Sequence, residues 1–104
     1  MMMPPAVARQ AEIDRAVRRV EKSLAPEVAM IRYHIDEDWS GRWAIFFRIV
    51  LSDEASRRER LGDIVSEVIS QLSERLDFDS LGVFPYHNFR NTSEQASLRE
   101  EAWA

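Results

Sequence analysis

Residues 42–51 read RWAIFFRIVL, a run dominated by β-branched and aromatic side chains. This composition favours a β-strand, in which successive side chains alternate between two faces. One face carries Trp43, Ile45, Phe47, Ile49 and Leu51, and the other carries Ala44, Phe46, Arg48 and Val50. Because both faces are largely apolar, the strand is either covered on both sides or offers its second face to another chain.

A second strand is predicted just before this run. The apolar residues Ile31, Tyr33 and Ile35 alternate with polar ones, which is the period-two pattern of a half-buried strand. Residues 37–41 connect the two runs and contain Asp, Ser and Gly, which favour turns. The sequence therefore predicts a β-hairpin over residues 31–51.

Helices are predicted on both sides of the hairpin. From about residue 8, apolar residues at spacings of four, three and four form one helical face that Pro26 ends: Ile13, Val17, Val20 and Leu24. After the hairpin, a longer apolar stripe indicates a helix that ends near its last member: Leu61, Ile64, Val65, Val68, Leu72 and Leu76. Either Ser52 or Ser56 is placed to cap the start of this second helix.

The two ends of the chain complete the pattern. Residues 81–89 predict a short third strand, which Pro85 confines to a sheet edge or a strand end. Thr92 followed by Gln95 resembles a capping box, so a C-terminal helix is expected over residues 93–103. Residues 1–7 are expected to form a flexible lead, and residues 8–104 a single domain.

The element order is helix, strand, strand, helix, strand and a final helix, which predicts an α+β, two-layer sandwich with a small mixed sheet. A crossover through the long helix would set the third strand parallel to the second. The same order occurs in half of a ferredoxin-like fold and in some KH-type RNA-binding domains, but topology alone carries no function. Exposed edges on so narrow a sheet favour pairing with a second copy or another protein.

Composition excludes several functional classes. The chain has no cysteine, and Lys22 is its only lysine. Phosphate-binding glycine loops, the nucleophile elbow and the zinc-protease motif are missing from the sequence, so no cofactor is predicted. A net charge of −4, from 14 basic and 18 acidic residues, disfavours general nucleic-acid binding. Without a signal-peptide pattern or an apolar run of about 20 residues, a cytoplasmic location and no membrane contact are expected.

Two chemical sites are candidates. His34, Asp36 and Asp38 lie at a strand end, where an imidazole and carboxylates could serve a metal-dependent enzyme, with Asp53 or Glu54 as a further ligand. The alternative is a solvated acidic hairpin, because acids at a sheet edge discourage wrong pairing.

RNA binding is the second candidate. Residues 84–91 combine aromatic side chains, a histidine and amides, as a base-stacking platform would. The first helix adds a basic face of Arg15, Arg18, Arg19 and Lys22. A terminal strand and a solvated helix face would look the same, and Gly62 lacks the partner glycine of a KH-type loop.

Trp39, in the middle of the predicted turn, either anchors an interface or folds back over Tyr33 or Trp43. Taken together, the sequence favours a small, acidic, non-catalytic protein-binding module, such as an inhibitor, an antitoxin- or immunity-like partner, or an accessory subunit. Its partner would be another protein or a second copy of itself. The predicted contact residues are Trp39, Phe46, Tyr86, Phe89 and Trp103, with an acidic rim of Asp36, Glu37 and Asp38.

Overall fold

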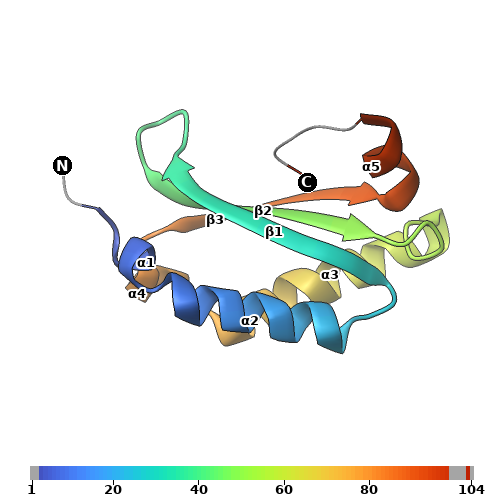
Figure 1. Ribbon diagram of the computed structural model, residues 1–104, viewed down its shortest axis with the longest axis horizontal. Helices are drawn as coiled ribbons and strands as arrows, with labels where there is room; N and C mark the ends of the chain where they lie inside the picture. The colour runs from blue at the N-terminus through green and yellow to red at the C-terminus, as the bar shows by residue number, and fades with distance from the viewer. Residues whose placement is uncertain (1–2, 99–102, 104) are drawn as a thin grey trace.

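A computed structural model describes residues 3–98 and 103. Its elements are α1 (Pro5–Ala8), α2 (Gln10–Ser23), β1 (Val28–Glu37), β2 (Trp43–Leu51), α3 (Arg58–Arg75), α4 (Phe78–Leu81), β3 (Phe84–Asn91) and α5 (Thr92–Leu98). Helices α2 and α3 lie together on one face of a three-stranded sheet, whereas the β1–β2 turn and α5 rise on the opposite side (Figure 1). The predicted α+β sandwich is confirmed.

The sheet has the order β1-β2-β3, with β2 in the centre. Strand β1 pairs with β2 antiparallel, and β3 pairs with β2 parallel, so the predicted hairpin and crossover are both present. Pro85 lies in β3, an edge strand, where its missing N–H costs little.

The hydrophobic core lies between the sheet and the two long helices. Alternate residues of β2 point into it, and Ile45, Phe47 and Ile49 have no exposed surface. They meet helix residues at the predicted stripe positions, including Ile13, Val20, Val68 and Leu72. Burying each such side chain contributes about 1.5–3 kcal/mol, which explains why these two helices cover this face of the sheet.

Helix α3 begins at Arg58, later than either predicted cap. Ser52 Oγ accepts a hydrogen bond from the Ala55 N–H at 3.1 Å, and Ser56 Oγ donates to the Asp53 carbonyl at 2.9 Å. Both serines therefore close turns before the helix. Ala55, which is fully buried, fixes this segment against the core.

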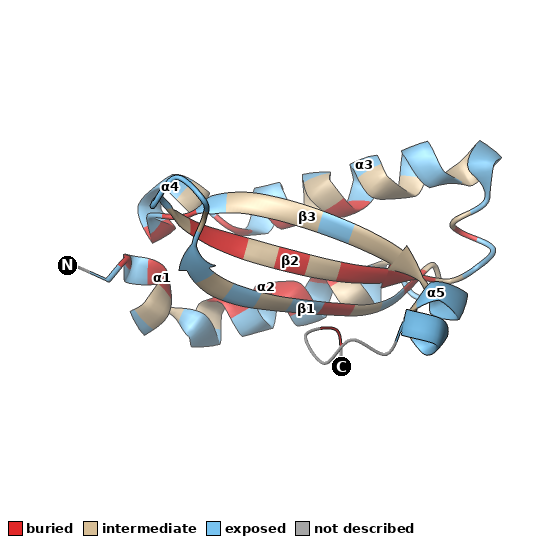
Figure 2. Ribbon diagram, turned by 90° about the horizontal axis from the view of Figure 1, so that it is seen from above, coloured by how far each residue is buried: buried red, intermediate tan, exposed pale blue. Residues whose placement is uncertain are grey.

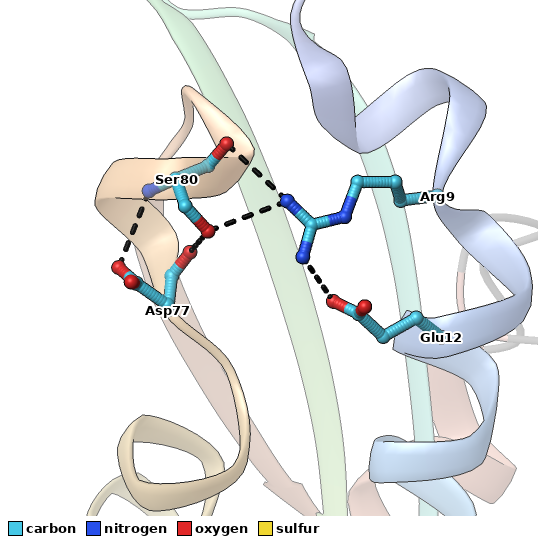
Figure 3. A network of polar contacts seen from close by, with 4 residues as sticks. All are labelled: Arg9, Glu12, Asp77 and Ser80. Atoms are coloured by element: carbon cyan, nitrogen blue, oxygen red, sulfur yellow. Dashed lines mark hydrogen bonds and ion pairs between the residues drawn. The ribbon is translucent and has the colours of Figure 1, made fainter.

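The predicted flexible lead is wrong for residues 4–7, and residues 1–2 lie outside the described part. Residues 5–8 form α1, and Ala6 is fully buried. Just after this helix, an Arg9 Nη donates to both the carbonyl and the hydroxyl of Ser80, at 3.4 and 3.3 Å, and its other Nη pairs with Glu12 at 2.7 Å (Figure 3). These contacts tie the start of the chain to α4.

The C-terminal helix α5 is capped one residue earlier than predicted. The Glu94 N–H donates to Asn91 Oδ1 at 2.8 Å, and the Asn91 N–H donates to Glu94 Oε1 at 3.1 Å, which is a reciprocal capping box. Thr92 and Ser93 instead donate their hydroxyls to Asp53. The rest of the predicted helix falls mainly on residues 99–102, outside the described residues. Within the described ranges, no helix combines the length and apolar character needed to cross a bilayer.

Candidate interaction surface

The two long helices leave the other face of the sheet uncovered, and we call this face the open face (Figure 2). The strand register arranges its side chains in four rows that cross β1, β2 and β3. In order along the strands, these are the Asp36 row (Asp36, Ala44, Phe84), the aromatic row (His34, Phe46, Tyr86), the arginine row (Arg32, Arg48, Asn88) and the Val50 row (Met30, Val50, Arg90).

The aromatic row is a continuous stack. The His34 and Phe46 ring centroids lie 4.9 Å apart with an interplanar angle of 13°, and those of Phe46 and Tyr86 lie 5.1 Å apart at 9°. These separations match the spacing of neighbouring strands. The rings therefore stand on edge with their faces against one another, and the stack presents ring edges and polar atoms to a partner.

Arg48 lies at the centre of the open face, half-buried on the middle strand. Its guanidinium contacts His34 Nδ1, and its buried Nε has no hydrogen-bond partner. Burial, followed by the nearby Arg48 charge, lowers the pKa of His34. A neutral His34 that accepts at Nδ1 carries its proton on Nε2, which leaves that N–H as a donor.

The β1–β2 turn is organised around the carboxylate of Asp38. It accepts hydrogen bonds from the Ser40 N–H at 2.9 Å, the Ser40 hydroxyl at 2.6 Å, the Arg42 N–H at 3.0 Å and the Tyr86 hydroxyl at 2.9 Å. These hydrogen bonds, that of the Ser40 hydroxyl above all, hold the pKa of Asp38 well below its usual range. Because Tyr86 belongs to β3, the network anchors the turn to the far edge of the sheet.

Trp39 stands at the tip of this turn with 93% of its surface exposed. Of the two alternatives for Trp39, the one in which it folds back over Tyr33 or Trp43 is therefore wrong. Gly41, at φ +83°, closes the turn behind it in a conformation that suits glycine. The hairpin thus presents a large apolar side chain to solvent from a turn that its own hydrogen bonds hold in place.

The other predicted contact residues are only partly brought together. Phe46 and Tyr86 lie side by side on the open face, and Asp36 and Glu37 are exposed at the end of β1. Phe89 packs against the core on the opposite face, so it does not join them. Asp38 is not a free rim residue, because its side chain is only 2% exposed beneath its donors.

Trp103 is the remaining predicted contact residue, and it is largely buried at 7% exposure. Its ring lies against the Arg90 guanidinium, 4.2 Å from the ring centroid, and its carbonyl accepts from Gln95 Nε2 at 2.8 Å. Trp103 therefore covers the Val50 end of the open face.

The candidate metal site gains no support from this arrangement. Among the described residues, no three histidine or carboxylate side chains form a group able to hold a metal ion. Asp38, one of the three proposed ligands, already accepts from three neighbouring residues.

Both edge strands of the sheet have backbone groups that are not available to pair with a further strand. On β1, the Ile31 N–H donates to Glu21 Oε2 at 2.7 Å, and its carbonyl accepts from an Arg32 Nη at 3.3 Å. On β3, Pro85 has no N–H, and the Asn91 N–H is used by Glu94. Such blocked edges disfavour addition of a further strand, so the open face is the better place for a partner.

The sequence indicated Arg48 only as the one polar residue on the second face of its strand, and Phe84 only as part of the aromatic segment 84–91 and not as a contact residue. Phe84 is 44% exposed and packs edge-on against Tyr86, with ring centroids 5.2 Å apart, beneath the Arg42 guanidinium. The alternation of residues 84–91 was the available signal, because it places Phe84 and Tyr86 on the same face. No model of a known protein family matches the chain, and no curated protein matches it significantly.

Proposed function

We propose that this protein is a non-catalytic protein-binding module that docks through the open face of its sheet and through Trp39. The observation that carries the proposal is the position of Trp39, 93% exposed on a turn anchored by Asp38. Exposed tryptophans are frequent anchors of protein interfaces. A turn that is ordered before binding lowers the entropic cost of docking.

RNA binding, the second candidate, is less well supported. Bases stack on the flat faces of aromatic rings, but in the aromatic row those faces are already occupied by neighbouring rings. The basic residues of α2 lie on the other side of the sheet from this row (Figure 1). The two parts of the predicted RNA site therefore do not form one surface.

The proposal can be tested by purifying the tagged protein from its native cells at low salt and identifying what it retains. We compare the wild type with Trp39→Ala and Phe46→Ala, and with Leu61→Ala as a matched control. Leu61 is exposed on α3, away from the open face. The proposal expects a protein partner that the wild type and the control retain and that both open-face variants lose.

Two results would overturn this function. If the Trp39 and Phe46 variants retain the same proteins as the wild type, the open face and turn are not the docking surface. If the wild type instead retains nucleic acid that is released as salt rises, phosphate contacts dominate binding and the RNA alternative replaces the proposal.

A further inference from the structure

We infer that the protein partner of the open face presents an aspartate or glutamate side chain, whose carboxylate pairs with the guanidinium of Arg48. The inference rests on the proposed function and adds the chemistry by which the partner is recognised. It comes from the surroundings of Arg48, the basic residue on the central strand of the open face.

Arg48 differs from the other partly buried arginines. Among the described residues, four arginines are half-buried: Arg9, Arg48, Arg60 and Arg90. Arg9 and Arg60 form ion pairs with glutamates, at 2.7 Å and at 3.2 and 3.3 Å, and Arg90 lies over the Trp103 ring. Within the described part of the chain, Arg48 contacts no carboxylate. Its partner is His34, which is neutral when it accepts at Nδ1.

The sheet itself brings no acid close to Arg48. On the open face, the strand register surrounds it with eight residues, none of them acidic: Met30, Arg32, His34, Phe46, Val50, Tyr86, Asn88 and Arg90. Asp36 pairs with Ala44, which lies four residues from Arg48 along β2, or roughly 14 Å. Burial lowers the pKa of Arg48, and no described carboxylate offsets this effect. Arg48 is therefore a charge partly removed from water without a counter-charge, which a carboxylate from another chain would supply.

The shape of the open face suits a protruding segment of the partner. Arg48 is only half-buried, and the neighbouring His34 is exposed. The β1–β2 turn and α5 rise at the two ends of this face (Figure 1), and Trp103 covers the end nearer α5. These features prevent a flat surface from lying along the strands. A loop or chain end of the partner can reach Arg48 and also contact Trp39 on the turn.

The charges on this face favour a carboxylate over a phosphate. The two other arginines near Arg48 are already engaged, since Arg32 lies 3.8 Å from Glu21 Oε2 and Arg90 lies over Trp103. A phosphate monoester carries about −1.5 to −2 charges and is typically bound by a cluster of arginines. A carboxylate carries one charge, which a single guanidinium balances. The net charge of −4 also disfavours polyanions such as nucleic acid.

Random peptides displayed on phage and selected on the full chain test the inference. The wild type should enrich peptides that contain aspartate or glutamate beside apolar residues. Selection on Arg48→Gln should lose the acidic enrichment, because the charge that attracts the carboxylate is gone. Arg15→Gln removes a charge from the exposed side of α2, so it is the matched control and should enrich the same peptides as the wild type.

The decisive step is a double-mutant cycle on one selected peptide, measured by isothermal titration calorimetry. Changing the acidic residue of the peptide to its amide and changing Arg48 to Gln should each raise the dissociation constant by about tenfold. The two changes together should raise it little further, because both remove the same contact. The change in the peptide leaves the protein intact, and circular dichroism confirms that Arg48→Gln is folded.

Three outcomes overturn the inference: peptides without acidic enrichment, losses in the cycle that simply add, or Arg48-dependent binding of a single-stranded RNA oligonucleotide, which would make phosphate the anion. The proposed function is judged separately. If the selected peptides require Trp39 and Phe46 but not Arg48, the binding module stands without the carboxylate contact. A selection that enriches no peptide, or only peptides that bind all three variants like the wild type, overturns both.

Discussion

At the scale of single residues, we expect Trp39 to contribute to binding but little to the stability of the fold. With 93% of its surface in water, it contributes little to the folded state, so Trp39→Ala should change the free energy of unfolding by no more than about 0.5 kcal/mol. Loss of an interface anchor should weaken association by about 1–2 kcal/mol, or roughly tenfold. Thermal melting measures the first effect, and the amount of partner that the tagged variant retains measures the second. A fall in melting temperature without weaker association would show that Trp39 is a structural residue.

Asp38 has the opposite role, because it serves the fold of the turn. Asp38→Ala removes the acceptor for Ser40, Arg42 and Tyr86, so we expect a lower melting temperature and faster amide hydrogen exchange at Ser40 and Arg42. Asp36→Ala is the control, since within the described part of the chain the Asp36 side chain accepts a hydrogen bond only from the N–H of the next residue, Glu37. Equal exchange rates in the two variants would mean that other contacts hold the turn.

The two histidines make stability depend on pH. Burial lowers the pKa of His87, and burial together with Arg48 lowers that of His34. The unfolded chain therefore binds more protons just below pH 6.5, so stability should fall as pH decreases from about 7.5 to about 5. His87 stacks on Phe47 with ring centroids 5.5 Å apart, and His87→Phe should keep that contact while reducing the fall. An unchanged slope of melting temperature against pH in this variant would contradict the assignment.

At the scale of elements, two glycines should respond in opposite directions to the same change. Gly62 lies within α3 with nothing within 4 Å of an added Cβ, so Gly62→Ala should stabilise the protein by about 0.5–1 kcal/mol. Gly82 follows α4 at φ +71°, and an added Cβ would come within 2.9 Å of Pro5 Cδ. Gly82→Ala should therefore cost about 1–3 kcal/mol. Urea unfolding of both variants tests the pair. A Gly82→Ala variant as stable as the wild type would show that α1 can shift away from the added Cβ at little cost.

Periodicity predicted every long element but not all of their ends. The stripe of α3 follows from burial of one helical face, which sequence spacing records directly. The first residue of α3 cannot be predicted from this spacing, because Ser52 and Ser56 make hydrogen bonds within turns once Ala55 is buried. The cap of α5 is Asn91 because Thr92 donates to Asp53, a contact made across 39 positions of sequence. Such long-range competition is invisible to a local motif.

At the scale of the molecule, the sequence left open whether the second face of β2 is covered or meets another chain, and it could not show which residues of β1 and β3 lie beside it. Phe89 was grouped with Tyr86, although residues three apart on a strand must point to opposite faces. The four rows of the open face can be identified only from the strand register, which pairs His34 with Phe46 and Phe46 with Tyr86. That register depends on the geometry of the turn and on the packing of the crossover helix, which no single segment encodes.

Trp103, the last residue that the structure describes, covers one end of the open face. Trp103 and Val50 are both buried, at 7% and 2% exposure, yet neither belongs to the core beneath the helices. The open face therefore has a small apolar cover of its own, at the end opposite the β1–β2 turn. Trp103→Ala should cost about 2 kcal/mol, a loss that Trp39→Ala should not share. Urea unfolding compares the two variants directly, and equal stability would mean that Trp103 adds nothing to the fold.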